Sequence, residues 1–145
     1  MVKFRIEKDS LGSIKVPSDK LWGAQTQRSV QNFKIGVGKF HFQEDFIKAL
    51  AFQKKAAALT NAQLKLINKR HAVIIGKVCD QIIQGKLNEH FPLVIWQTGS
   101  GTQINMNFNE VIANKSNLLL GSKLPSNKPL HPNDDINKSL SLIHI

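Results

Sequence analysis

The sequence predicts a mainly α-helical domain whose N-terminal segment is irregular and partly extended. Two observations support this prediction. Apolar residues recur at helical spacing in three long stretches after residue 43, whereas glycines and a proline interrupt short apolar stretches before it. The chain has 145 residues, of which 41% are hydrophobic, which is enough for one domain of ordinary size with its own core.

Residues 1–40 are predicted to be extended segments and loops rather than long helices. A helix is then expected over about 44–67, where the apolar positions are Phe46, Ile47, Leu50, Ala57 and Leu64. On this helix Lys54 and Lys55 lie on the other, polar faces. A second helix is expected over about 69–84, with Gly85 at the place of a C-cap glycine. A short link makes the two helices antiparallel.

The second half of the chain alternates between loops and one more helix. The apolar run 91–96 (FPLVIW) is expected to be buried, in a strand or a loop. A helix is predicted over about 103–120, ended by Gly121, and a loop over 121–138 with three prolines. Trp22 and Trp96 are predicted core anchors. Cys79 lies on an apolar helix face, so it is interpreted as a small core residue rather than a nucleophile.

Several classes of protein are excluded by composition. No apolar run approaches the ~20 residues that a membrane span needs. The single cysteine excludes a disulfide framework and a multi-cysteine zinc site, and no histidines stand at metal-ligand spacing, so we expect no metal site. The first residues, MVKFRIEKDS, lack the apolar core of a secretory signal, which predicts a cytoplasmic location.

A net charge of +10 raises the question of nucleic-acid binding. The basic residues are scattered, however, and the densest pairs are Lys54-Lys55 and Lys69-Arg70, both within predicted helices. The eight phenylalanines and two tryptophans do not interleave with the basic residues, as a base-stacking surface would require. The preferred interpretation is a solvated lysine surface, with no nucleic acid among the partners.

The strongest chemical signal is Gly99-Ser100-Gly101-Thr102, directly before a predicted helix. Glycines let a ligand approach the backbone closely, and free N–H groups at a helix N-terminus favour a carboxylate or phosphate. Ser100 and Thr102 add hydroxyl donors. Neither a P-loop nor a dinucleotide fingerprint fits the spacing. The alternative is that Ser and Thr only cap the helix, and the spacing alone leaves both interpretations open.

A second group of polar residues is His131-Pro132-Asn133-Asp134-Asp135. Pro132 biases His131 towards extended geometry, and Asn133 and Asp134 are typical of turns and helix N-caps. One interpretation is the start of a helix. The other is a rigid turn that presents an imidazole and backbone donors on one side.

Four stretches of the chain are shared, in order and spacing, with one known family. They are EKDSLG at residues 7–12, LWGAQTQRS at 21–29, most of 95–114, and HPNDD at 131–135. On these motifs the sequence resembles the N-terminal domain of class II fumarases, in the fumarase/aspartase superfamily, from about residue 5 to 139. Aspartases tend to carry an Ala-Gly-Thr-Ser type of loop at 99–102, so aspartase is the second match.

The resemblance implies a mainly helical N-terminal domain without the family's central helix bundle. It also implies reversible hydration of fumarate to (S)-malate with no metal or organic cofactor. In that family a base removes a proton from malate C3, and the resulting carbanion is stabilised by its neighbouring carboxylate. Fixed hydrogen-bond donors around that carboxylate supply the stabilisation, a role that a helix N-terminus suits.

Site residues follow by matching this chain to the family's motifs. Four residues would hold substrate: Ser100, Gly101, Thr102 and Ser141. Three would belong to the family's second dicarboxylate site: His131, Asn133 and Asp134. Arg28 and Asn107 are lesser candidates with equally good structural interpretations. The family's catalytic histidine and its mobile serine loop lie in parts that would follow residue 145, so no catalytic residue is implied in this chain.

Departures from the family pattern are concentrated at the C-terminal end. Leu142 and Ile143 replace a Ser and an Asn, and Ile104 stands where a Ser is usual. We therefore expect a fumarase-like domain over 1–139 and a divergent, truncated tail over 140–145. The family forms homotetramers through the bundle that this chain lacks, so the chain alone is expected to be inactive.

Three functional hypotheses remain open at this stage. The first is part of a fumarate hydratase that a second chain carrying the bundle would complement. Another is a non-catalytic module that binds dicarboxylates or docks on a partner. The third is a fragment of an aspartase-like ammonia-lyase.

Overall fold

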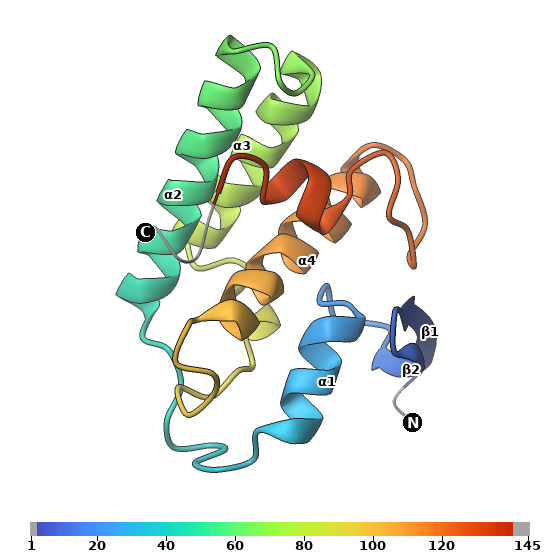
Figure 1. Cartoon of the computed structure of the whole chain (residues 1–145), viewed down its shortest axis with the longest axis vertical. Coiled ribbons are helices and arrows are strands. Elements are labelled where there is room, and N and C mark those ends of the chain that lie inside the picture. Colours follow the sequence, from blue (N-terminus) through green and yellow to red (C-terminus); the bar gives the residue numbers. More distant parts are fainter. Residues whose placement is uncertain (1–2, 141–145) are drawn as a thin grey trace.

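The computed structural model describes residues 3–140. Two strands form an antiparallel hairpin at the N-terminal end (Figure 1), β1 (Phe4–Asp9) and β2 (Gly12–Pro17), with Phe4 opposite Pro17 and Asp9 opposite Gly12. Four α-helices follow: α1 (Ala24–Asn32), α2 (Glu44–Gln63), α3 (Lys69–Ile83) and α4 (Thr102–Leu119). Two short turns of helix complete the described part, η1 (Asn88–His90) and η2 (Pro132–Ile136).

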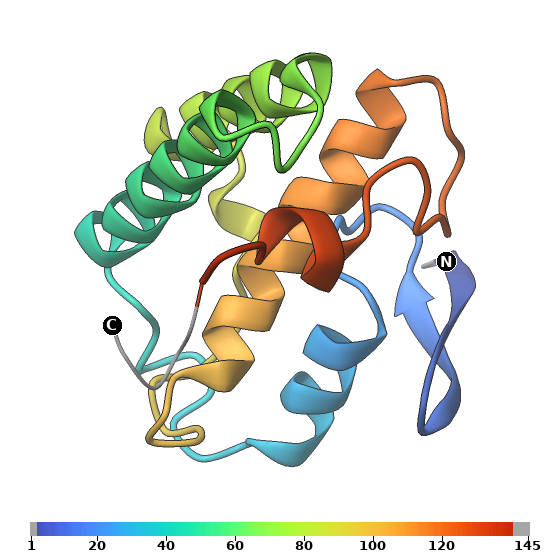
Figure 2. The same cartoon turned by 45° about the horizontal axis from the view of Figure 1, so that its top comes forward.

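Helix α4 is the centre of the arrangement. It contacts α1, α3 and η2, while α2 and α3 pack against each other as an antiparallel pair (Figures 1 and 2). The hairpin packs on α1, on the other side of α4 from the α2–α3 pair. The turn η2 crosses over α4 in Figure 2. Segments that are distant in sequence therefore meet around the N-terminal half of α4.

Apolar spacing explains why α4 is central. Ile104, Phe108, Val111 and Ile112 recur at intervals of about one and two turns and are all buried. The ring of Phe108 lies 4.4 Å from that of Phe91, centroid to centroid. Residues of α3 complete the core from the other side: Ile75, Val78, Cys79 and Ile82. Cys79 is thus a core residue, as predicted, and burial raises the pKa of its thiol to about 12.

The three long helices agree with the sequence prediction to within a few residues. The largest difference is at the end of α2, which stops at Gln63 because the chain turns at Lys65, where φ is +60°. Asn68 caps α3, and its side chain accepts from the N–H of Arg70 at 2.8 Å. Gly85 has φ of +74°, the left-handed geometry expected just after a helix end.

Helix α1 was not predicted, since residues 1–40 were expected to lack longer helices. Its buried residues are Ala24, Thr26 and Ser29, which are small or polar and give no apolar pattern in the sequence. Its N-cap residue, Gly23, offers no side-chain acceptor. The Glu110 side chain of α4 supplies the cap instead. A helix stabilised by such a distant residue leaves no local signal.

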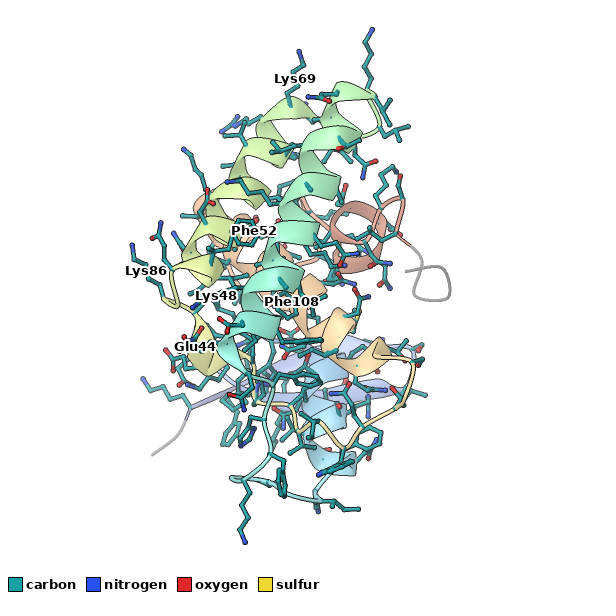
Figure 3. The ribbon with its side chains drawn as sticks, turned by 90° about the vertical axis from the view of Figure 1, so that its left-hand side faces the viewer. Glu44, Lys48, Phe52, Lys69, Lys86 and Phe108 are labelled. Atoms are coloured by element: carbon teal, nitrogen blue, oxygen red, sulfur yellow. The ribbon has the colours of Figure 1, made fainter. Side chains whose placement is uncertain are left out.

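Two single-residue predictions are wrong. Trp96 is 54% exposed and stacks edge-to-face on Phe40 at the surface, whereas Trp22 is buried as expected. Lys54, placed on a polar face by the sequence, is only 1% exposed, because its ammonium reaches two asparagine side chains. The other lysines follow the prediction better, as Lys69 and Lys86 point outward at opposite ends of α3 in Figure 3.

Over residues 3–140 no helix combines the length and the apolar character needed to cross a membrane. The segment 91–96 forms one isolated bridge, between Val94 and His41, and is otherwise a loop.

Candidate functional site

A pocket of about 560 Å³ lies where β1, the start of α1, the first half of α4 and η2 meet. Its walls include Thr102, which follows the glycine-rich loop, together with His131 and Asn133 from the second motif. Residues from the two sequence motifs thus line one pocket. Ser100, Gly101 and Asp134 do not line it. Ser141 lies outside the described residues.

The glycine-rich loop gives α4 an exposed N-terminus. Gly101 has φ of +70°, a conformation that glycine adopts without strain. The Gln97 side chain accepts from the N–H of Ile104 at 2.9 Å, so Gln97 caps the helix, and Ser100 and Thr102 do not. Within residues 3–140 the N–H groups of Thr102 and Gln103 have no acceptor. This leaves two backbone donors beside the pocket.

Hydroxyl groups in this loop are linked to one another. Thr102 Oγ1 lies 2.7 Å from Ser100 Oγ and 3.2 Å from Thr98 Oγ1. Because a hydroxyl both donates and accepts, Thr102 can turn its proton towards a ligand while accepting from Ser100. Ser100 would then act through Thr102 rather than by touching the ligand.

The His131 segment is organised by its own imidazole. His131 Nδ1 accepts from the N–H groups of Asn133 and Asp134, both at 3.3 Å, which makes His131 the N-cap of η2. The prediction that Asn133 and Asp134 are the capping residues is wrong in this respect. Since Nδ1 is an acceptor here, the neutral ring carries its proton on Nε2, which is a donor. His131 both caps the turn and lines the pocket, so its two interpretations are compatible.

Asn117 fixes the backbone that leads into His131. This fully buried side chain accepts from the N–H of Leu130 at 2.9 Å and donates to the carbonyls of Leu130 and Ser126. The loop before His131 is therefore tied to the end of α4. Sequence reasoning gave no role to Asn117.

Two of the three acidic side chains that line the pocket, Asp9 and Glu7, are paired with arginines. Asp9 receives two hydrogen bonds from the Arg28 guanidinium, both at 2.8 Å, and this pair lowers the pKa of Asp9. Glu7 is paired with Arg5 at 2.7 Å. Consequently these carboxylates do not exclude an anion from the pocket. Arg28, a lesser candidate in the sequence, is committed to Asp9.

Glu110 is the third acid of the pocket wall, and it was not predicted. Its carboxylate accepts from the N–H groups of Gly23, Gln25 and Thr26 at 2.8, 2.9 and 3.0 Å. Burial raises the pKa of Glu110, and these N–H bonds act in the opposite direction. A Cβ on Gly23 would lie 2.9 Å from Glu110, so only glycine permits this approach.

Lys54 lies beneath the pocket and was also missed. Its Nζ donates to Asn105 Oδ1 at 2.7 Å and to Asn137 Oδ1 at 2.8 Å, and both asparagines line the pocket. Burial lowers the pKa of Lys54 to about 8. Asn107, the other lesser candidate, is fully buried and donates to the carbonyl of His90, so its role is structural.

No group of three or more His, Cys, Asp or Glu side chains that could hold a metal ion occurs in the part of the chain that the structure describes. The pocket is lined instead by hydrogen-bond donors. Backbone N–H groups, a hydroxyl, an imidazole N–H and asparagine amides converge on the pocket, and such groups bind carboxylates.

Comparison with known proteins identifies the family. A family model described as lyase matches residues 12–142. The chain belongs to this lyase family, that of the fumarases and aspartases. It is 54% identical over 140 residues to the class II fumarate hydratase of Bacillus cereus, with 97% of this chain and 30% of the relative covered. It is likewise 54% identical over 138 residues to rat mitochondrial fumarate hydratase, covering 95% of this chain and 27% of that relative.

Solved structures give the same result. The class II fumarase of Schistosoma mansoni matches with a TM-score of 0.86 and 42% identity, over 93% of this chain and 28% of that one. A fumarate lyase:delta crystallin from Brucella melitensis, in native form, matches with a TM-score of 0.89 and 40% identity, over 97% and 33%. The fold is that of the N-terminal domain of these lyases. The chain spans about 30% of the length of the curated relatives it matches.

Proposed function

We propose that this chain provides a dicarboxylate-binding pocket of a class II fumarate hydratase, with fumarate and (S)-malate as its ligands. The observation that carries the proposal is the shared pocket of Thr102 and His131, in which donors from two separate segments face one space. One carboxylate would bind at the N-terminus of α4, where the N–H groups of Thr102 and Gln103 have no acceptor among the described residues. His131 Nε2 and Asn133 supply donors for further carboxylate oxygens.

We assign binding, and no proton transfer, to residues 3–140. A general base needs a lone pair free to take a proton from the substrate. His131 Nδ1 already accepts two N–H bonds, so its lone pair is engaged within the turn. Asp9 and Glu7 are held by arginines, and Glu110 by three backbone N–H groups. Hydration of fumarate would therefore take its base from another chain or segment.

A calorimetric titration tests the binding role. Fumarate and (S)-malate are titrated into the wild-type chain, a Thr102→Val variant and a Thr60→Val control on the exposed surface of α2. The wild type and Thr60→Val are expected to bind alike. Thr102→Val loses one hydroxyl donor to a carboxylate and should bind about tenfold more weakly. Absence of heat with both ligands, or equal affinity of Thr102→Val, would refute this function.

A second candidate is a binding module without turnover, because the residues that line the pocket offer no free base. A complementation assay separates the two. Loss of fumarate absorbance is followed for the chain alone and after mixing with a chain that carries the rest of the relatives' length. Turnover only in the mixture supports the hydratase, whereas binding without turnover in either case supports the module. Ammonia release from aspartate would point instead to an aspartase-like lyase.

We further propose assembly with other subunits, in a cytoplasmic setting. Helix α2 exposes three large apolar side chains: Phe46, Phe52 and Leu59. Phe52 is labelled in Figure 3. Phe52 and Leu59 lie about two turns apart and share one face of the helix, and clustered apolar side chains mark contact surfaces. Light scattering of the chain, alone and in the complementing mixture, measures the assembly that the homotetramers of this family lead us to expect.

A further inference from the structure

We propose that Lys54 is a positioning residue of the pocket, whose buried ammonium orients the side-chain amides of Asn105 and Asn137 so that Asn137 donates to a bound carboxylate. This inference rests on the proposed dicarboxylate function. It concerns a lysine that touches no ligand itself and acts through two neighbours.

The geometry is a closed triangle of polar groups. Lys54 comes from α2, Asn105 from the first turn of α4, and Asn137 directly follows η2. Nζ donates to Asn105 Oδ1 at 2.7 Å and to Asn137 Oδ1 at 2.8 Å, and Asn105 Nδ2 donates to Asn137 Oδ1 at 3.1 Å. The ammonium thus links three elements at the point where they form the pocket.

The direction of each amide follows from this triangle. The oxygen and the nitrogen of an amide point in opposite directions, and only the oxygen can accept from an ammonium. Because Asn137 Oδ1 accepts two hydrogen bonds within the triangle, its Nδ2 is directed away from Lys54. Among the described residues no acceptor meets this Nδ2, and Asn137 lines the pocket. Without the ammonium the amide is free to turn and to present its oxygen, which would repel a carboxylate.

The positive charge of Lys54 also favours a carboxylate in the pocket. The groups that meet the Lys54 ammonium are neutral. They are the amides of Asn105 on α4 and Asn137 after η2, and the Cys79 thiol on α3, whose pKa burial raises to about 12. No carboxylate pairs with Lys54 in the described structure. Its positive charge is therefore uncancelled beneath a pocket in which Asp9 and Glu7 already have arginine partners. The adjacent Lys55 differs, since it forms an ion pair with Asp80 at 2.7 Å.

The test compares Lys54→Met with Lys55→Met, two neighbouring lysines on one helix. Binding of (S)-malate is measured by calorimetry from about pH 7 to about pH 9.5, above the ordinary range of histidine. Wild type and Lys55→Met should lose about tenfold in affinity as Lys54 releases its proton near pH 8. Lys54→Met should bind about tenfold more weakly at pH 7 and show no such dependence. If Lys54→Met bound (S)-malate with the affinity and the pH dependence of the wild type, the proposal would be overturned.

A ligand-free measurement separates this proposal from the proposed function. The side-chain NH₂ signals of Asn105 and Asn137 are followed by NMR across the same pH range. They should shift with a midpoint near pH 8 in the wild type and stay constant in Lys54→Met. If they do so while malate fails to bind, the positioning role stands and the dicarboxylate function falls. If they do not respond, the positioning role is wrong.

A second variant guards against a purely structural effect. Asn137→Asp keeps an oxygen partner for the ammonium, so folding and thermal stability should be retained. It removes the NH₂ donor and adds a negative charge at the pocket, so binding of (S)-malate should be lost. Wild-type affinity in Asn137→Asp would contradict the proposed role of the amide.

Discussion

Changing Lys54 to methionine tests how the buried ammonium affects the stability of the fold. Burial lowers the pKa of Lys54 from 10.5 to about 8. Between those values the unfolded chain keeps the proton that the folded chain has released, so the free energy of unfolding rises with pH. One pH unit corresponds to about 1.4 kcal/mol. Because of Lys54, the free energy of unfolding therefore rises by about 3 kcal/mol from pH 8 to pH 10.5.

Cys79 acts with the opposite sign at higher pH. Burial raises the pKa of its thiol from 9.0 to about 12, so above pH 9 the unfolded chain loses a proton that the folded chain keeps. Between pH 9 and pH 10.5 the stabilisation from Lys54 and the destabilisation from Cys79 cancel. From these two groups the wild type gains about 1.4 kcal/mol between pH 8 and pH 9, stays nearly level to pH 10.5, and then loses stability.

Urea denaturation at fixed pH, followed by the fluorescence of the buried Trp22, measures this profile. Comparison of the wild type with Lys54→Met removes the contributions of all shared groups. The difference in their free energies of unfolding should change by about 3 kcal/mol between pH 8 and pH 10.5, in favour of the wild type as pH rises. In Cys79→Ala the fall at high pH should disappear. A difference between wild type and Lys54→Met that stays constant over this range would refute the reasoning.

Three further substitutions test the contacts that build the pocket. Glu110→Gln puts an amide NH₂ against backbone donors, and urea denaturation should show a loss of about 2 kcal/mol. Gly23→Ala forces a Cβ against the same carboxylate, so a loss of about 1–3 kcal/mol and weaker far-UV helix signal are expected; unchanged stability would contradict the close approach. Asn117→Leu removes the bonds to the loop before His131, so the Leu130 amide should exchange its hydrogen faster and malate affinity should fall. Wild-type exchange at Leu130 would argue against this role.

The long helices could be predicted because their own residues carry the signal. In α4 the apolar positions repeat at helical spacing, and a glycine stands near each end. The two motifs that contribute to the pocket could also be found locally, since glycine and proline mark the turns on which they lie. That Thr102 and His131 line the same pocket could not be predicted, because it depends on how η2 crosses α4.

The features that were missed depend on partners far along the chain. Helix α1 is capped by Glu110, which is 87 residues from Gly23 in sequence. Lys54 is buried because it reaches Asn105 and Asn137, 51 and 83 residues away. A lysine on a helix is ordinarily a surface residue, and no local pattern separates Lys54 from Lys55. These contacts exist only once α2, α4 and η2 have packed together.

The central claim is that one pocket, formed by the N-terminus of α4 and the His131 segment, binds a four-carbon dicarboxylate. An NMR titration of the ¹⁵N-labelled chain with (S)-malate tests it most directly. The backbone amides of Thr102 and Gln103 and the side chains of His131 and Asn137 should shift together along one saturable curve. Shifts confined to exposed lysines, or shifts that grow without saturation, would contradict the claim.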